Sequence, residues 1–381
     1  MTYHSIPMCL AVLILASGSE CVPPNSNEPA GIFPVLDEPL PDPHVFHDGD
    51  AYYIFGTGTH FFHGDALEPA AMKRDELELD FAEEGGPFQI WAFKPYVHTD
   101  GSYHAYVTIH YGFFITVVAH FVPQEGEVWQ PGEPIRRWRF NRILAGDKSG
   151  DGPMAYDPYV QRDADGDLFL FYCHSNGRHT DVRIVAQRML DPETPDPDFE
   201  PRLILEPEGY RSEDRNPGYI QLVEAANLAA FDGTYLLLYS VGDFALHAGQ
   251  PSNYKIGVAF ADQLIPPPGE TYRKTVIPDP DNVWGNEDKT DEVWYLLQSQ
   301  KPEWPNYCAE WVQGPGVASI VEIDDAPWLV FHGYEPGLDS IGPNDRRVWK
   351  APLDVRIDRN RPQHEWVRVR LPKSQPTEGT G

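Results

Sequence analysis

The sequence predicts an all-β fold, a five-bladed β-propeller, because one hairpin pattern recurs along nearly the whole chain. Five times in 381 residues an extended run ends at an Asp-Gly or Asp-Asp pair and continues as an apolar strand. The five pairs are Asp48-Gly49, Asp100-Gly101, Asp165-Gly166, Asp232-Gly233 and Asp324-Asp325. Asp-Gly between strand-like runs is a strong hairpin signal, because the tight turn needs positive φ at its central positions. The turns are 52 to 92 residues apart, which leaves room in each repeat for a four-stranded blade.

The segments after the turns support this assignment. They read AYYIFGTG, SYHAYVTIH, DLFLFYCHS, TYLLLYSVG and APWLVFHGY, which are rich in the aromatic and β-branched residues that favour strands. The 38 Pro and 32 Gly are typical of many short strands joined by irregular loops. Because the repeats span nearly all of the chain, we expect a single propeller domain over residues 31–375, followed by a disordered tail over 376–381.

The charge of the chain excludes some classes of partner. The formal net charge is −29 at pH 7, which argues against nucleic acid and anionic membrane surfaces. A neutral glycan is indifferent to this charge, and the 10 Trp, 19 Tyr and 19 Phe suit surfaces that stack on sugars. We therefore expect a carbohydrate partner, and the oligomeric state cannot be read from the sequence.

The N-terminus resembles an export signal. Residues 8–16, MCLAVLILA, are apolar but too few to span a bilayer, and small residues and a Pro/Asn-rich stretch follow. We interpret residues 1–30 as a signal peptide and tether, which predicts a secreted or periplasmic protein. Cys21 offers an alternative, an acylated cysteine that anchors a lipoprotein. Of the later cysteines, Cys173 and Cys308 form either a disulfide or two unpaired buried thiols.

Three repeats carry a carboxylate shortly before their turn. These are Asp42 in DPHVF, Asp157 in DPYVQ and Glu224 in EAANLAAF. If the first strand of each repeat lies nearest the central axis, the three acids converge at one mouth of the channel. Such burial of like charges is costly unless they are hydrated, protonated or functional. The alternative for the two aspartates is structural, since an Asp before Pro can fix a turn by accepting bonds from nearby backbone N–H groups.

The order of these pieces resembles glycoside hydrolase family 43, a family of inverting five-bladed propellers that cleave arabinan and xylan. The carrying segments are PDPHVFHDGDAYYIFGTGT, IWAFKPYVHTDGSYHAYVTI, YDPYVQRDADGDLFLFY, VEAANLAAFDGTYLLLYS, NYKIGVA, GPGVASIVEIDDAPWLVFHGYE and RRVWKAPLDVRIDRNRPQ, which together cover about residues 39–372. The chain departs from the family in two places. It has Trp-Ala-Phe-Lys-Pro where Trp-Ala-Pro is usual, and Glu-Ala-Ala where Glu-Gly-Pro is usual.

The resemblance implies a role for each acid. Asp42 matches the general base, Glu224 the general acid, and Asp157 the carboxylate that orients the acid and raises its pKa. An inverting hydrolase needs two carboxyl groups about 6.5–9.5 Å apart, so that a water molecule fits beside the anomeric carbon. Glu224 lies among apolar residues, where a protonated carboxyl is favoured over an ionised one.

Four further residues complete the predicted site. Trp91 begins the second repeat where the acid is missing, and we expect it to stack on the sugar, with Phe46 and Tyr156 as weaker candidates of the same kind. The alternative for Trp91 is packing between blades. His332 lies eight residues after its turn, and the same offset elsewhere gives Gly56, Thr108, Cys173 and Ser240, a ring of small groups. The resemblance implies that this histidine contacts a structural Ca²⁺ in the channel through water; otherwise it is a neutral histidine bonded to water. No cofactor is expected to be required for catalysis.

The resulting prediction is a secreted inverting glycoside hydrolase that cleaves α-L-arabinofuranosyl or β-D-xylosyl linkages of plant-type polysaccharides or oligosaccharides. Two alternatives stay open. One is a glycan-binding propeller without turnover, and the other is a related propeller glycosidase that acts on galactosidic or fructosidic bonds. A Trp-rich segment over about residues 263–313 is longer than a blade connection needs, and its tryptophans either line subsites or pack the insertion against the blades.

Overall fold

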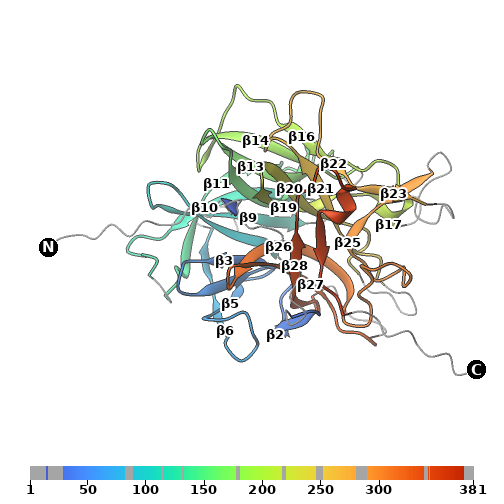
Figure 1. Cartoon of the computed structure of the whole chain (residues 1–381). Coiled ribbons are helices and arrows are strands. Elements are labelled where there is room, and N and C mark those ends of the chain that lie inside the picture. The colour runs from blue at the N-terminus through green and yellow to red at the C-terminus, as the bar shows by residue number, and fades with distance from the viewer. Residues whose placement is uncertain are drawn as a thin grey trace, which may run out of the picture.

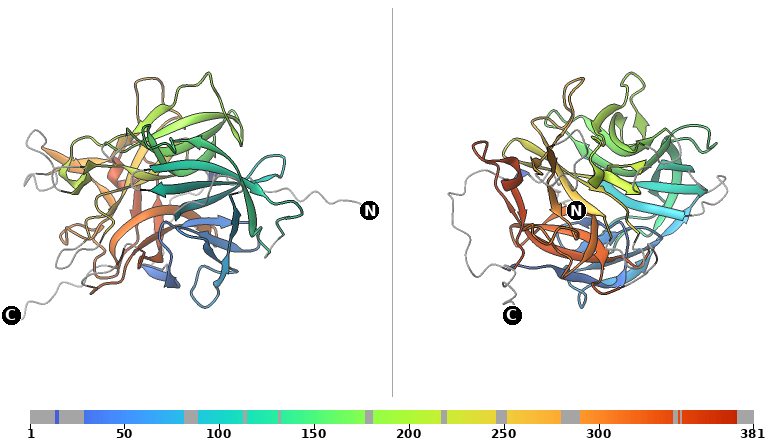
Figure 2. Two further views of the ribbon diagram at one scale, coloured as in Figure 1. Left: turned by 180° about the vertical axis from the view of Figure 1, so that it is seen from behind. Right: turned by 90° about the vertical axis from the view of Figure 1, so that its right-hand side faces the viewer.

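The computed structural model confirms the all-β, five-bladed β-propeller (Figure 1). It describes residues 14–15, 29–81, 89–112, 115–130, 133–176, 181–216, 220–245, 252–279, 290–338, 342 and 344–372. The right-hand view of Figure 2 shows the sheets around a central axis, with the colour running once round from blue to red. The predicted signal peptide and tether lie almost wholly outside the described residues, as do Cys21 and residues 376–381. The strands of the five blades and their edges run from Phe33 to Val369, within the predicted 31–375.

The first three blades are consecutive antiparallel sheets. Blade 1 contains β3 (His44–His47), β4 (Tyr52–Phe55), β5 (His60–Gly64) and β6 (Lys73–Glu76). Blade 2 contains β8 (Gln89–Val97), β9 (Tyr103–Gly112), β10 (Ile115–Pro123) and β11 (Arg137–Ala145), with β7 (Glu78–Asp80) parallel to β11. Blade 3 contains β12 (Met154–Arg162), β13 (Leu168–Ser175) and β14 (Arg183–Asp191), and β15 (Thr194–Pro195) and β16 (Arg202–Leu205) both pair with β14.

Blade 4 has additions on both sides. Its strands β19 (Glu224–Phe231), β20 (Thr234–Val241) and β21 (Lys255–Ala261) are joined by β22 (Arg273–Lys274) and β25 (Tyr295–Leu297), which both pair with β21. The short β1 (Ile14–Leu15) runs parallel to β19. Two small sheets, β17 (Asp214–Asn216) with β18 (Ile220–Gln221) and β23 (Val276–Pro278) with β24 (Asp291–Val293), accompany the blades, as do the 3₁₀ turns η1 (Arg211–Glu213) and η2 (Gln363–Glu365).

Blade 5 closes the ring with a strand from the other end of the chain. It contains β26 (Gln313–Ile323), β27 (Ala326–Tyr334) and β28 (Arg347–Val355), and β2 (Phe33–Pro39) pairs antiparallel with β28. Just beyond β2, the Leu40 N–H donates to the Arg346 carbonyl at 3.0 Å. The third partner of β28 is β29 (Val367–Val369). The first and last parts of the domain are thus held in one sheet, a pairing that the hairpin pattern did not predict.

All five predicted turns join the first two strands of a blade. The Asp232-Gly233 and Asp324-Asp325 turns are two residues long with positive φ at both positions. This is the geometry that matches the twist of the flanking strands. The other three loops are longer and place their glycine at positive φ.

The hydrophobic core is divided among the five interfaces between blades. Blades 1 and 2 bury Phe55 against Phe93, and blades 3 and 4 bury Phe171 with Leu237. The remaining three interfaces have clusters of their own. Each blade is therefore stabilised mainly by its two neighbours, and the backbone around the axis is held from all sides.

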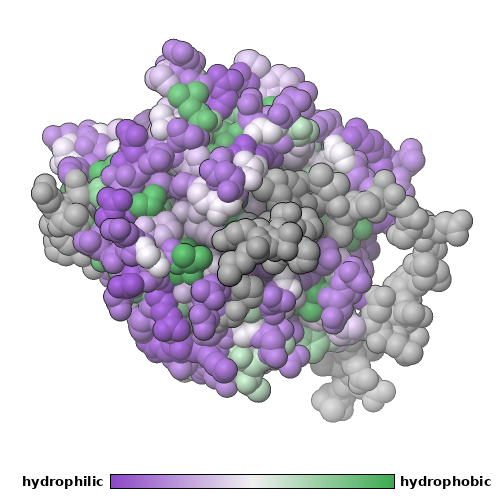
Figure 3. All heavy atoms as spheres, turned by 90° about the vertical axis from the view of Figure 1, so that its left-hand side faces the viewer, coloured by the Kyte–Doolittle hydropathy of each residue, from purple (hydrophilic) through white to green (hydrophobic). Residues whose placement is uncertain are grey.

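The surface is predominantly polar. The face in Figure 3 is mostly hydrophilic, with small separated hydrophobic areas. Within the described ranges, no helix is long and apolar enough to cross a membrane. Cys173 and Cys308 are buried free thiols, so the structure contradicts the disulfide alternative and agrees with unpaired thiols.

The Trp-rich insertion packs against the blades. Trp294 is only 9% exposed and stacks on Trp304 with ring centroids 5.0 Å apart, and Lys301 lies over Trp304. Trp311 packs against the core between blades 4 and 5. Trp284 lies outside the described residues. For the three described tryptophans the packing alternative is therefore the one that the structure favours.

Candidate active site

Each blade has one residue with positive φ at, or just before, its innermost strand. These are Asp42 (58°), Ala92 (48°), Asp157 (50°), Ala225 (59°) and Val317 (43°). Residues other than glycine rarely adopt this conformation, and for a β-branched residue such as Val317 it is an outlier. In blades 2 to 5 the pairing register shifts at the same place, so each inner strand carries a β-bulge there. A bulge re-aims the neighbouring side chains, and here it does so in four of the five blades around one axis.

The bulges are held by the ring of groups eight residues after each turn. The backbone N–H of Asp157 donates to Thr108 Oγ1 at 2.9 Å, and that of Val317 donates to Ser240 Oγ at 2.8 Å. Each bond joins a bulge to the preceding blade. The predicted ring of small groups is therefore present, and it fixes the strained backbone from which the carboxylates project.

The Asp42 carboxylate is surrounded by polar donors. Thr57 Oγ1 donates to Oδ2 at 2.5 Å, and Arg346 Nη1 donates to Oδ1 at 3.2 Å. The Asp42 N–H donates to His332 Nδ1 at 2.8 Å. The side chain is 19% exposed, so water can reach it. A carboxylate that accepts two bonds and meets solvent can remove a proton from a water molecule.

Glu224 lies in a drier setting than Asp42. It is 8% exposed, and two phenols donate to its carboxyl group: Tyr254 to Oε1 at 2.6 Å and Tyr156 to Oε2 at 3.2 Å. Burial and the Glu224 carboxylate raise the pKa of Tyr254 well above its ordinary value, so this phenol stays a donor. The two tyrosines come from different blades and fix the plane of the carboxyl group.

Asp157 links the other two acids. Burial raises the pKa of Asp157 from 3.8 to about 8, with further contributions from Glu224 and Asp42, while Lys94 and Arg346 lower it. The three acids, from blades 1, 3 and 4, are therefore close enough to interact electrostatically, in line with the predicted convergence. The raised pKa of Asp157 means that this buried carboxyl keeps its proton to near neutral pH.

Tyr254 occupies the site because blade 5 has a glycine there. A Cβ on Gly316 would collide with the Tyr254 ring. Gly316 stands at the position where blade 4 has Glu224, directly before the residue with positive φ. The ring also stacks on His332, with centroids 5.8 Å apart and planes 19° apart. The missing side chain of blade 5 thus makes room for the phenol that holds Glu224.

The three predicted sugar-stacking residues differ in where they lie. Tyr156 is at the site, bonded to Glu224. Trp91 directly precedes Ala92 and is therefore the blade-2 counterpart of Glu224; it is partly exposed and stacked on His110 with ring centroids 4.5 Å apart. Phe46 is not brought to the site. It packs against Trp129, with ring centroids 5.0 Å apart, in the core between blades 1 and 2, because β3 carries it four residues away from Asp42.

Sequence reasoning missed two cations and one phenol. Arg346 contacts Asp42, and Lys94 acts electrostatically on both Asp157 and Asp42. Lys94 was visible as the departure Trp-Ala-Phe-Lys-Pro, which inserts a basic residue into the inner strand of blade 2. Tyr254 is the second residue of the segment NYKIGVA, but nothing in that segment indicates a contact with Glu224.

The residues around His332 do not suit a calcium ion. Its Nδ1 accepts the Asp42 N–H, and its Nε2 lies 2.9 Å from Arg346 Nη1. Burial and the guanidinium lower the pKa of His332 well below its ordinary value, so the ring is neutral. Ca²⁺ prefers a shell of oxygen ligands, whereas this ring is fully engaged and faces a fixed cation. Among the described residues no group of three or more His, Cys, Asp or Glu could hold a metal.

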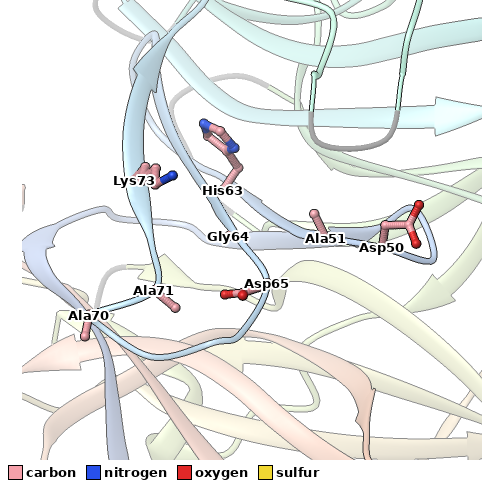
Figure 4. Close-up of a pocket in the computed structure, with 8 residues that line it drawn as sticks. All are labelled: Asp50, Ala51, His63, Gly64, Asp65, Ala70, Ala71 and Lys73. Carbon is pink, nitrogen blue, oxygen red and sulfur yellow. The ribbon is translucent and has the colours of Figure 1, made fainter.

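A separate surface hollow lies on blade 1. It has a volume of about 580 Å³, and its lining includes Asp50, His63, Asp65 and Lys73 (Figure 4). Asp50 belongs to the turn at the end of β3 opposite Asp42. None of the predicted site residues lines this hollow, so it is distinct from the cluster of acids.

The fold is similar to solved glycosidase structures over almost their whole length. A thermostable family-43 glycoside hydrolase has a TM-score of 0.61 at 18% identity, over 91% of this chain and 97% of that one. An α-L-arabinofuranosidase from Lactobacillus brevis has a TM-score of 0.62 at 17% identity, over 91% and 97%. A Cellvibrio cellulosa α-L-arabinanase complexed with arabinohexaose has a TM-score of 0.58 at 18% identity, over 87% and 95%.

No family model and no curated protein matches the sequence. At these identities the structural likeness establishes the fold, and the resemblance to family 43 is confirmed at that level. What the chain does is therefore argued from its own site.

Proposed function

We propose that the protein is an inverting glycoside hydrolase. The observation that carries the proposal is the contrast between two carboxyl groups that both act on Asp157: Asp42, partly exposed to solvent and bonded to a cation, and Glu224, buried and bonded to two phenols. Two titratable groups in such different environments are suited to opposite proton transfers. Asp42 is the general base, and Glu224 is the general acid.

The reaction follows from these roles. Asp42 takes a proton from a water molecule, and that water attacks the anomeric carbon from one face of the sugar. Glu224 protonates the leaving oxygen on the other face, so the bond breaks without releasing an alkoxide. Asp157, which interacts electrostatically with Glu224, makes the loss of the proton from the pair costly until the leaving oxygen accepts it.

For the substrate we propose an α-L-arabinofuranosyl or β-D-xylosyl linkage. The similar structures include an α-L-arabinofuranosidase and an α-L-arabinanase with bound arabinohexaose, which supports a pentose substrate. Trp91 is proposed to stack on the sugar bound next to the acids. Export, with Cys21 as an alternative lipid anchor, is proposed from the sequence of residues 1–30. The mass of the mature protein recovered from its natural host would test this point.

The experiment that tests the function is proton NMR of the first anomeric product. Aryl α-L-arabinofuranosides, β-D-xylosides and galactosides would be hydrolysed by the wild type, with Glu224→Gln as control. Inverted product that is lost in the variant is the expected result. Retained configuration would overturn the inverting mechanism and make Asp42 a nucleophile. No turnover on aryl or polymeric substrates, together with binding on a glycan array, would instead support a binding protein.

A further inference from the structure

A layer of polar side chains lies across the channel beside the three acids. In every blade, the residue two positions after the one with positive φ belongs to this channel layer: His44, Lys94, Tyr159, Asn227 and Ser319. Tyr159 contacts His44 with ring centroids 6.4 Å apart, and Asn227 Nδ2 donates to Ser319 Oγ at 3.2 Å. Since His44 and Tyr159 come from blades 1 and 3, which are not neighbours, their contact reaches across the axis.

Lys94 is the one member of the channel layer with a fixed positive charge. Its side chain is 6% exposed, and its ammonium lies 5.5 Å from the centroid of the Tyr159 ring. Among the described residues, no hydrogen bond or ion pair within 4 Å reaches this ammonium. The carboxylates that act on it are Asp157 and Asp42. A buried ammonium without a direct partner costs several kcal/mol in general, so the neighbouring acids must offset that cost.

Arg346 supplies a second positive charge from another direction. Its guanidinium bonds Asp42, approaches His332 Nε2 and lies 5.2 Å from the centroid of the Phe244 ring. It comes from the start of blade 5's third strand, whereas Lys94 comes from the inner strand of blade 2. Two cations from separate blades thus act on Asp42 and Asp157, at the place where the resemblance implied a calcium ion.

We propose that Lys94, together with Arg346, is the built-in counter-charge of the carboxylate cluster, and that the protein neither binds nor needs a divalent cation in its channel. Lys94 is a positioning residue: it stabilises the ionised forms of Asp42 and Asp157 without touching the sugar. The part of this proposal that concerns rate rests on the proposed function. The part that concerns metal and stability does not.

The metal arm of the test uses the wild-type protein alone. Metal content would be measured by mass spectrometry after purification without chelator, and Tm would be recorded with EDTA and with added CaCl₂. We expect no stoichiometric metal and the same Tm in both conditions. One bound calcium per chain, or a Tm that falls in EDTA and recovers with calcium, would overturn the proposal whether or not the protein is a glycosidase.

The rate arm compares Lys94→Met with Lys350→Met. Lys350 is a matched control, because it is 8% exposed and its ammonium lies 5.2 Å from the centroid of the Trp328 ring, but in blade 5 and away from the acids. We expect Lys94→Met to lower kcat about 10- to 100-fold with little change in KM, as for loss of a preorganised charge, and Lys350→Met to leave kcat unchanged.

A third variant, Lys94→Arg, separates charge from shape. It retains the positive charge, so we expect it to recover most of the activity that Lys94→Met loses. Equal activity of Lys94→Met and wild type would overturn the role of Lys94. If Lys94→Met does not fold, Lys94→Arg and the metal arm still decide the proposal, since a chain that depends on calcium fails the metal arm.

Discussion

The surroundings of Asp42 and Glu224 differ in almost every respect although both acids interact with Asp157. Asp42 accepts from a hydroxyl and a guanidinium and is partly open to solvent. Glu224 is buried and accepts from two phenols. Positive charge and water stabilise the ionised form of a carboxyl group. In a dry pocket with neutral donors, the neighbouring charges decide whether the group is ionised or protonated. The proposed roles of base and acid therefore depend on the blades around each carboxyl group.

The largest effects are expected when each acid is removed and the leaving group of the substrate is varied. Asp42→Asn should lower kcat about 10³-fold or more on every substrate, because no group then activates water. Glu224→Gln should lower kcat as much on substrates with poor leaving groups. The loss should be much smaller on 2,4-dinitrophenyl glycosides, because their leaving group departs without a proton. The measurement is kcat/KM across an aryl glycoside series. Equal leaving-group dependence in the two variants would contradict the assignment.

Asp157 should make the stability of the protein depend on pH, because its pKa is raised in the folded state. In the folded protein its pKa is raised from 3.8 to about 8, so the folded state binds an extra proton across that window. Stability therefore falls as pH rises from about 4 to about 8. Asp157→Asn removes this effect and should raise Tm at pH 8 by roughly 2 °C or more, while kcat drops about 10- to 100-fold.

Thermal unfolding at pH 5 and pH 8 would check this prediction. The gain in Tm should be smaller at pH 5, where the wild-type carboxyl is already protonated in the folded state. A variant less stable than the wild type at pH 8 would show that Asp157 serves the structure more than the reaction.

The two tyrosines on Glu224 offer a smaller contrast. Tyr254→Phe removes a 2.6 Å hydrogen bond from a fully buried phenol, and Tyr156→Phe removes one of 3.2 Å. Removal of one partner of a buried hydrogen bond costs about 1–3 kcal/mol, so Tyr254→Phe should cost roughly tenfold or more in kcat/KM and Tyr156→Phe less. Steady-state kinetics on one aryl glycoside would rank them. The reverse ranking would mean that Tyr156 is the main support of the acid.

The smallest effects should come from the aromatic residues outside the acid cluster. Trp91→Ala should raise KM about 3- to 10-fold with kcat nearly unchanged, because it removes the aromatic face proposed to stack on the sugar, and stacked aromatic pairs contribute about 0.5–1.5 kcal/mol beyond area burial. Phe46→Leu, in the core between blades 1 and 2, should change KM little and lower Tm instead. If Trp91→Ala affected only Tm, its contact with His110 would be structural.

Some of these features could be predicted because they are local or repeat along the chain. The Asp-Gly turns fix hairpins by their own φ requirements, and their spacing predicts blades. Equal offsets from the turns also predicted that Thr108, Ser240 and His332 belong to one ring. Phe46 shows the limit of this reasoning, because an aromatic residue near an acid in sequence can be carried into the core within four residues of strand.

The five hairpins, the all-β fold and the three blades that carry an acid can be read from the sequence, since turn chemistry and strand periodicity depend on neighbouring residues. The folded chain was needed to see that β2 completes blade 5, that Tyr254 reaches Glu224 over Gly316, and that Lys94 and Arg346 act on Asp42 and Asp157. The physical reason is that these contacts join residues far apart in the chain, where closure of the ring brings them together. No local preference encodes such a meeting, because it depends on how all five blades pack around the axis.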